Sequence, residues 1–406
     1  MRLSNNQLSV LSLVSKALFG SKTYISIENF TLLKEESYDQ AVLLLVYSVV
    51  SSILPSSDVE SWTDLSDTIS AMNMTVDFEH SELHELMIEN NIPYTTIKGS
   101  GSAYYYPNPF KRMLGDVDFI VHKEDLDRAG SVLESAGFIR TEDKEHEAHI
   151  AYHRGDFSTW EMHFSINGIP DDKSGELLRH YLSDIIEKSV LYDVDGRVFR
   201  MPCTFHHGLI LLIHTAEHLT CTGIGLRHLC DWAVFANRLS DEEFLDLFEE
   251  KLKKVGLWNF ACILTILSER YLRMRHCAWV DSIEKPSEDY LERLMVDIFS
   301  GGNFGTKDKQ RLNQAKLISD SSNRQIGKTN AVGQLIKSMN YKARIKMPII
   351  KKAPILMPIG WIYTVCWYVG LLIKGKRPSI NMKQMVEGAE ERREIYKEFK
   401  LFEVEP

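Results

Sequence analysis

The sequence predicts a mixed α/β (α+β) protein, in which helical modules at both ends flank a small mixed sheet with its own covering helices. Three observations lead to this fold class. Strand-like alternation is confined to the stretch between residue 91 and about residue 200. Helical periodicity dominates on both sides of that stretch. The chain of 406 residues, 44% hydrophobic and 25% charged, can bury a sizeable core, which excludes wholesale disorder.

The changes in periodicity divide the chain into four regions. We expect a helical amino-terminal region, a domain that contains the sheet, a helical domain, and a linker that leads into a basic, apolar carboxy-terminal region. Their predicted boundaries are residues 1–90, 91–200, 201–300 and 301–406.

The amino-terminal region contains two clear helical patterns. Residues 41–54 are almost entirely apolar and end at Pro55, which indicates a buried helix. Residues 81–90 have the spacing of an amphipathic helix that ends before Pro93. We interpret this region as structural, because no group of residues in it suggests chemistry.

The sheet domain contains four strand-like segments and one helix. The strands are expected within residues 94–99, 115–121, 149–154 and 157–166. Gly155 and Asp156 separate the last two segments, which predicts a hairpin. The helix is expected within residues 123–137, with acidic residues in its first turn and Gly137 at its end.

The following region again shows helical spacing, in residues 206–219 and 225–239. His214 and His218 lie four residues apart in the first of these helices. We favour core histidines over metal ligands, because the helix is rich in leucine and isoleucine and no glutamate directly follows His214. The Gly- and Asn-rich residues 300–314 indicate a linker.

Charge is distributed very unevenly along the chain. The net charge is −9, yet residues 321–386 contain no aspartate or glutamate and twelve basic residues, so the remainder carries −21 (−9 minus 12). The basic residues are Arg324, Lys328, Lys337, Lys342, Arg344, Lys346, Lys351, Lys352, Lys374, Lys376, Arg377 and Lys383. The acidic remainder excludes a uniformly basic nucleic-acid binder.

Within the basic segment, residues 353–373 carry no charge. Pro354, Pro358 and the basic flanks on both sides argue against a simple membrane span. We expect contact between residues 337–383 and an anionic membrane surface. A buried helix with a basic rim is the alternative, and no specific nucleic acid is expected as a partner. Six scattered cysteines and no continuous apolar run at the amino terminus predict a cytoplasmic protein, at most peripheral at the inner face of the cell membrane.

Two predicted strands carry acidic side chains on their polar faces. Asp116 and Asp118 alternate with Val117 and Phe119, so both carboxylates point away from the core. Such a pair suits a divalent cation, and Mg²⁺ binds through one or two carboxylates plus phosphate oxygens. In the last strand, Glu161 and His163 share the polar face in the same way.

Lys98, Gly99 and Ser100 form a small turn between a strand and a short helix, upstream of the Asp116 strand. Backbone N–H groups and a hydroxyl in such a turn suit a phosphate. The turn is a weak signal alone. It gains weight from its position before a strand with the pattern Asp-x-Asp.

The turn, the Asp-x-Asp strand and the later acid resemble the nucleotidyltransferase superfamily. More narrowly, Lys98–Gly99, Arg112 before Gly-Asp-x-Asp, and the Leu-Arg-x-x-x-Asp segment at residues 226–231 look like the uncharacterised nucleotidyltransferase family of bacterial polysaccharide and natural-product gene clusters. The resemblance covers roughly residues 80–300, and it implies that the predicted sheet is a small nucleotidyltransferase-like sheet.

The resemblance implies roles for individual residues. The metal-binding, catalytic residues would be Asp116, Asp118 and Glu161, with Mg²⁺ (or Mn²⁺) as the cofactor. Glu161 could instead act as general base, since an aspartate is commoner at this position. The nucleotide-binding residues would be Lys98, Gly99, Ser100, Arg112 and His163.

The activity implied is transfer of a nucleoside monophosphate from an NTP to an acceptor hydroxyl. Sugars and cell-surface polymer precursors are compatible acceptors, which would place the protein in polysaccharide biosynthesis. Two alternatives stay open: a non-catalytic nucleotide-binding or scaffold protein at the membrane surface, and transfer of the γ-phosphate.

Overall fold

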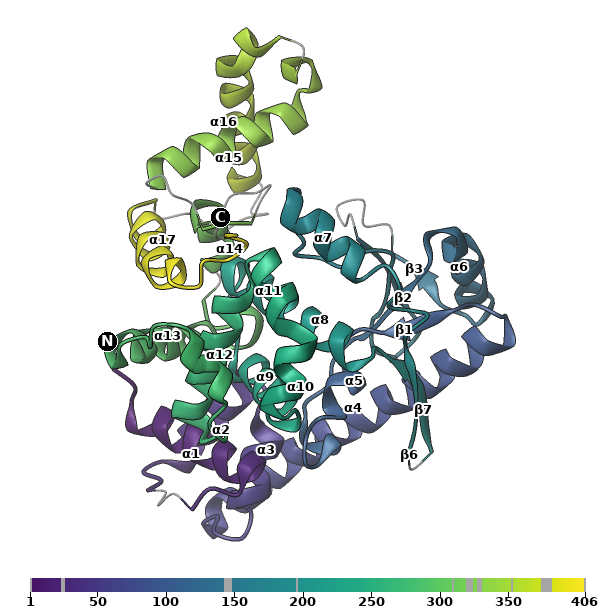
Figure 1. Ribbon diagram of the computed structural model, residues 1–406, viewed down its shortest axis with the longest axis vertical. Helices are drawn as coiled ribbons and strands as arrows, with labels where there is room; N and C mark the ends of the chain where they lie inside the picture. Colours follow the sequence, from purple (N-terminus) through teal and green to yellow (C-terminus); the bar gives the residue numbers. More distant parts are fainter. Residues whose placement is uncertain are drawn as a thin grey trace.

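The computed structural model describes most of the chain (Figure 1). The described residues are 2–22, 26–141, 148–194, 196–308, 310–318, 324–326, 331–351, 353–373 and 382–404. Five of the twelve basic residues of the acid-free segment lie outside this part of the chain: Lys328, Lys352, Lys374, Lys376 and Arg377.

Among the described residues, five strands form one mixed sheet with the order β1-β2-β5-β4-β3. The strands are β1 (Tyr94–Thr96), β2 (Val117–Val121), β3 (Ile139–Arg140), β4 (His149–His153) and β5 (Trp160–His163). Only the central pair, β2 with β5, is parallel; β1 with β2, β5 with β4 and β4 with β3 are antiparallel. The mixed fold predicted from the sequence is confirmed. The hairpin predicted at Gly155 and Asp156 is confirmed by the pairing of β4 with β5.

The alternation of the strands decides which face of the sheet is buried against helices. Phe119 of β2 and Met162 of β5 face a core that also contains residues of α4 and α6. That core makes the register of β2 and β5 unambiguous, because a slip by one residue would turn the acidic side chains inward. The covering helices are α4 (Ser56–Glu89) and α6 (Leu126–Ser135), with the short helix α5 (Ser100–Ala103) after β1.

Helix α4 connects the amino-terminal helices with the sheet, as Figure 1 shows. The amino-terminal helices are α1 (Asn5–Phe19), α2 (Phe30–Asp39) and α3 (Leu43–Val50). On α4, Glu79 is fully buried; it accepts hydrogen bonds from Trp160 Nε1 at 2.9 Å and from the backbone N–H of Ser158 at 3.0 Å. A carboxylate of α4 therefore anchors the start of β5. The division of the chain into four regions stays a prediction. Helix α4 lies within the first predicted region and leads directly to the second.

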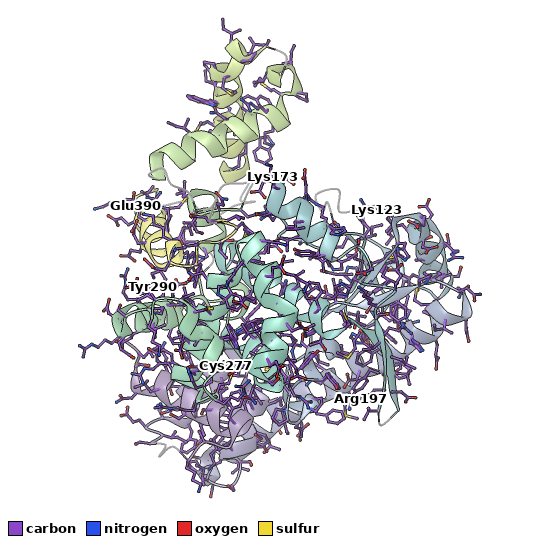
Figure 2. All side chains as sticks on the ribbon, in the orientation of Figure 1. Lys123, Lys173, Arg197, Cys277, Tyr290 and Glu390 are labelled. Atoms are coloured by element: carbon purple, nitrogen blue, oxygen red, sulfur yellow. The ribbon has the colours of Figure 1, made fainter. Side chains whose placement is uncertain are left out.

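The helical body packs on the other side of the sheet domain. Its helices are α7 (Lys173–Tyr181), α8 (Thr204–Cys221), α9 (Leu226–Arg238), α10 (Asp241–Phe244), α11 (Glu250–Val255), α12 (Trp258–Leu272) and α13 (Glu288–Gly301). One large apolar core joins α1 and α3 to α8, α9, α12 and α13. A separate two-stranded hairpin, β6 (Val190–Val194) with β7 (Arg197–Met201), precedes α8. In Figure 2, Arg197 of this hairpin and Lys123, which follows β2, lie well apart along the sheet domain.

The carboxy-terminal segment leaves the body and returns to it. Its helices are α14 (Arg311–Ile318), α15 (Ala331–Lys346), α16 (Met357–Ile373) and α17 (Met382–Lys397). Figure 1 shows α15 and α16 standing clear of the body, whereas α14 and α17 lie against it. Figure 2 places Glu390 of α17 and Tyr290 of α13 on the same side of the molecule, and the Tyr290 hydroxyl donates to the carbonyl of Ile395 at 3.0 Å. In the part of the chain that is described, no helix is both long and apolar enough to cross a membrane.

Candidate active site

Asp118 of β2 lies at the centre of a cluster of charged side chains. It is 7% exposed, and its Oδ1 is 2.8 Å from Lys98 Nζ and 3.0 Å from His163 Nε2. Burial raises the pKa of this carboxyl, but Lys98 and the hydrogen bond from His163 lower it by more, so its net pKa is well below the usual range. Asp118 is therefore a carboxylate in this structure, held by the ammonium group of Lys98 and by a hydrogen bond from His163.

The parallel pairing of β2 with β5 brings the third predicted acid to this cluster. Asp118 stands opposite Glu161, and Ile120 stands opposite His163. His163 Nε2 is also 3.4 Å from Glu161 Oε2, so this nitrogen faces two carboxylates and carries a proton. Burial lowers the pKa of His163, whereas its hydrogen bonds to Asp118 and Glu161 raise it by more.

Strand β4 adds a histidine that the sequence analysis did not single out. His149 pairs with His163 across the antiparallel β4–β5 ladder, and its Nε2 is 3.8 Å from Glu161 Oε1. Donor atoms of His149, Glu161 and His163 lie within 4.8 Å of one another, a spacing suited to a metal ion. The predicted hairpin at Gly155 would have revealed this histidine, because counting back from the turn pairs it with His163.

Asp116 precedes β2 and differs from Asp118 in its surroundings. Its side chain is accessible to solvent, and no cation in the described part of the chain lies within ion-pair distance of it. Desolvation and the negative charges of Asp118 and Glu161 raise its pKa to about 6. The repulsion shows that the three predicted acids share one electrostatic field and that this field is rich in negative charge.

The turn at Gly99 lies against this cluster through the backbone. Gly99 has φ +57°, a left-handed conformation that favours glycine, and a Cβ there would lie 3.6 Å from the carbonyl oxygen of Asp116. The hydroxyl of Ser100 is buried and donates to Asp77 Oδ1 of α4 at 2.8 Å. The structure therefore gives Ser100 a partner within the protein, and α4 holds the turn in place.

Arg112 lies in a buried ion pair with Asp231 of α9. Its Nε and Nη2 donate to the two carboxylate oxygens, each at 2.8 Å, and the Tyr106 hydroxyl donates to Oδ1 at 2.7 Å. This pairing joins the two segments that carried the narrower family resemblance, the arginine before Gly-Asp-x-Asp and the aspartate of Leu-Arg-x-x-x-Asp. The pair uses the Nε–Nη2 edge of the guanidinium, and the residue is only 6% exposed, which leaves little access for a phosphate.

Arg227, the arginine of the second motif, is placed differently. Its Nη1 donates to the carbonyl of Met113 at 3.1 Å, and its guanidinium lies 5.1 Å from the centre of the Phe304 ring. No carboxylate of the described residues forms an ion pair with it, and burial together with Arg112 lowers its pKa to about 10. The negative charges of Asp231 and, more weakly, of Asp116 act in the opposite direction, so this cation lies in the field of both carboxylates.

Helix α8 contributes Glu217 and the two histidines noted in the sequence. Burial raises the pKa of Glu217, and the positive charges of Arg324, Lys98 and His163 partly offset this shift. His214 and His218 lie with ring centres 4.3 Å apart; burial and Lys98 lower the pKa of both, that of His218 to about 3. These histidines are neutral at pH 7, in agreement with their interpretation as core residues.

A comparison with known protein families identifies the family to which the chain belongs. A family model described as an uncharacterised nucleotidyltransferase matches residues 37–273, more than half of the chain. The chain belongs to this family. The narrower resemblance noted in the sequence is thereby confirmed. No curated protein matches the chain.

Membership of the nucleotidyltransferase family supports nucleotidyl transfer as the general chemistry and an NTP as the substrate. The matched region includes both acidic strands, the Gly99 turn, α8 and Arg227. The donor set fits the divalent cation that such enzymes usually use, because Asp118 and Glu161 face each other across a strand pair and Asp116 shares their field. His149 and His163 would add nitrogen donors once His163 Nε2 gives up its proton, and Mn²⁺ accepts such donors more readily than Mg²⁺ does.

Proposed function

We propose that this protein transfers a nucleoside monophosphate from an NTP to the hydroxyl group of an acceptor. The observation that carries the proposal is the parallel pairing of β2 with β5, which sets Asp118 opposite Glu161. Two carboxylates on adjacent strands, with Asp116 beside them, concentrate negative charge on one face of the central strand pair. Such a concentration suits a site for a divalent cation and a triphosphate.

Asp116, Asp118 and Glu161 would hold the cation, Mg²⁺ or Mn²⁺, and Glu161 is also placed to act as general base. When bound, the cation would neutralise phosphate charge and orient the triphosphate. In this structure Lys98 and His163 both contact Asp118. We infer that Lys98 moves from Asp118 toward the triphosphate when metal and nucleotide bind, because its charge is then no longer needed at the carboxylate.

Arg227 is the second cation that we assign to the triphosphate. It has no carboxylate partner among the described residues, whereas Arg112 is held by Asp231. The Gly99 turn would approach the phosphates through its backbone. The predicted contribution of Arg112 is then indirect: it fixes α9, from which Arg227 extends. The predicted contribution of Ser100 is also indirect, through its hydrogen bond to Asp77.

The reaction can be written with its bonds balanced. The acceptor oxygen attacks the α-phosphorus and forms a new O–P bond, while the bond from that phosphorus to the α,β-bridging oxygen breaks. Pyrophosphate leaves. The proton of the acceptor hydroxyl passes to a carboxylate of the cluster, and Lys98 and Arg227 stabilise the charge on the departing pyrophosphate.

The test is incubation of the full chain with α-labelled NTPs, Mg²⁺ or Mn²⁺, and extracts that contain candidate sugar and polymer acceptors. We expect transfer of label that EDTA abolishes and that Asp118→Asn reduces at least about a hundredfold. Asp193→Asn, in the β6–β7 hairpin away from the cluster, is the matched control and should behave as the wild type. Equal labelling by Asp118→Asn and the control would refute the proposal, and label arriving only from the γ-phosphate would identify phosphotransfer instead.

The alternative is a nucleotide-binding or scaffold protein without turnover. The Lys98–Asp118 ion pair supports this alternative, since a carboxylate paired with a lysine has less need of a cation. It predicts that NTP binds with an affinity independent of Mg²⁺ and that no label is transferred to any acceptor. Calorimetric titration of NTP with and without Mg²⁺ separates the two functions.

We also propose that α16 contacts an anionic membrane surface. Its outward face carries Ile355 just before the helix, then Ile359, Ile362 and Cys366, all exposed and at helical spacing; Ile355 is 87% exposed. The opposite face packs on α15, where Gly360 lies against Ala343. The segment is free of acidic residues, so its charge is complementary to anionic lipid.

A further inference from the structure

Cys203 lies beside a histidine and an aspartate in an arrangement unrelated to the carboxylate cluster. It is the residue that precedes α8, and its Sγ lies 3.3 Å from His206 Nδ1. His206 Nε2 lies 3.0 Å from the carbonyl oxygen of Tyr181 and 3.1 Å from Asp184 Oδ1. At 1.5 Å per residue, Glu217 is roughly 21 Å farther along the helix, so this group lies at the other end of α8 from the candidate active site.

The partners of His206 decide where its protons lie. A carbonyl oxygen and a carboxylate can only accept hydrogen bonds, so Nε2 must carry a hydrogen. In the neutral ring, Nδ1 is then the acceptor, and its lone pair faces the thiol of Cys203. Transfer of the thiol proton to Nδ1 gives a thiolate beside an imidazolium, and Asp184 stabilises that imidazolium from the other side.

The surroundings of Cys203 stabilise the thiolate further. The sulfur lies at the amino-terminal end of an 18-residue helix, where the backbone dipole favours negative charge. Lys188, whose main partner is Asp184 at 2.6 Å, also lies in the field of the sulfur, where its positive charge favours the thiolate. Burial raises the pKa of Cys203, but the hydrogen bond with His206 lowers it by more.

We propose that Cys203 is a nucleophilic thiolate and a site of reversible modification by small disulfides. The side chain is partly exposed, so a small molecule can reach it. In the reaction, the thiolate attacks one sulfur of the disulfide and forms a new S–S bond, while the original S–S bond breaks. The departing thiolate takes the proton from His206, so no oxidant beyond the disulfide is needed. This proposal does not depend on nucleotidyl transfer.

The first test measures alkylation of each cysteine by iodoacetamide between pH 6.0 and pH 8.5, with peptide mass spectrometry. An ordinary thiol gains about a hundredfold in thiolate over this range. We expect the labelling of Cys203 to rise by a factor at least about threefold smaller than that of an ordinary thiol, with the exposed Cys366 as the internal comparison. A profile of Cys203 parallel to that of Cys366, or no labelling of Cys203 in the folded protein, would overturn the proposal.

Variants separate the role of the histidine from simple accessibility. His206→Gln should restore a steep profile at Cys203, and an unchanged shallow profile in a folded variant would contradict the proton transfer. His206 is buried, so Asp184→Asn provides a second variant whose side chain is 41% exposed. The Asp184→Asn substitution should make the pH profile of Cys203 alkylation steeper, but less steep than His206→Gln does. An unchanged profile would show that Asp184 does not stabilise the imidazolium.

The second test uses oxidised glutathione at pH 6.5 as the small disulfide. We expect a mixed disulfide at Cys203 that dithiothreitol removes, formed at least about tenfold faster than at Cys366. Cys203→Ser should lack the adduct. Modification of Cys366 at an equal or greater rate would overturn the assignment.

Discussion

Two arginines near the candidate site differ in what their guanidinium groups contact, and this difference gives a test at the scale of single residues. Arg112 is bound by Asp231 within the core, whereas Arg227 donates to one carbonyl and has no carboxylate partner among the described residues. Removing one partner of a buried ion pair leaves an uncompensated charge, which costs about 3–5 kcal/mol. Removing a charged contact to a phosphate costs affinity instead.

We therefore expect the same substitution to lower stability at one position and to weaken NTP binding at the other. Arg112→Met should lower the free energy of unfolding by about 3–5 kcal/mol in urea titrations. Arg227→Met should leave stability within about 1 kcal/mol and weaken NTP binding on the order of 10- to 100-fold, the value of a charged hydrogen bond. If Arg112→Met weakens binding in a folded, stable protein while Arg227→Met does not, the phosphate contact belongs to Arg112.

Strand alternation predicted which faces of the strands carry the acidic side chains. Alternation placed Asp118 and Glu161 on polar faces, and the structure brings these two side chains together across a strand pair. The partner of Arg112 could not be derived in this way. Asp231 is 119 residues away in sequence, and their contact depends on how α9 packs against the sheet domain.

At the scale of helices, a buried network joins α13, α14 and α17. Asp297 accepts hydrogen bonds from Arg311 Nη2 at 2.7 Å and from the Tyr396 hydroxyl at 2.5 Å, and Arg392 Nε lies 3.9 Å away. All four side chains are less than 9% exposed. Arg392 also donates to the carbonyl of Leu219 at the end of α8, at 2.9 Å, so the network ties the carboxy-terminal helix to the active-site helix.

Asp297→Ala should destabilise the protein by about 3–5 kcal/mol, because two buried guanidinium groups would lose their carboxylate. Asp289→Ala is the matched control on the same helix. Asp289 is exposed in the first turn of α13, where a carboxylate contributes only about 0.3–1 kcal/mol. Urea unfolding followed by circular dichroism measures both, and equal losses would show that the network contributes no more than a surface charge.

This network also explains why the connection between α13 and α14 was harder to predict from the sequence than the helices themselves. The Gly- and Asn-rich residues 300–314 indicate a linker by composition, yet the segment includes the start of α14, and Arg311 is 3% exposed. Local composition describes the turn around Gly302 correctly. It contains no information about Asp297 and Tyr396, whose positions decide that the arginine is buried.

At the scale of the whole molecule, the basic segment of the sequence coincides with helices that extend from an otherwise acidic body. The body contains the carboxylate cluster, and α15 and α16 extend away from it (Figure 1). Within the extension, Trp361 Nε1 donates to Asn340 Oδ1 at 2.8 Å, and Lys346 lies over the ring of Trp367. The two helices therefore hold each other, and the outward face of α16 is left for contact with something else.

We expect the full chain to float with vesicles of 70% phosphatidylcholine and 30% phosphatidylglycerol, and not with pure phosphatidylcholine. The paired change Ile359→Asp and Ile362→Asp should reduce flotation at least about tenfold, since each buried isoleucine contributes about 1.5–3 kcal/mol. Ile139→Asp, at an even more exposed isoleucine of β3, is the control and should float as the wild type does. Flotation that the paired change leaves intact would exclude this face as the contact. Loss of a dimer in the paired variant without lipid would identify a second copy of the chain as the occupant.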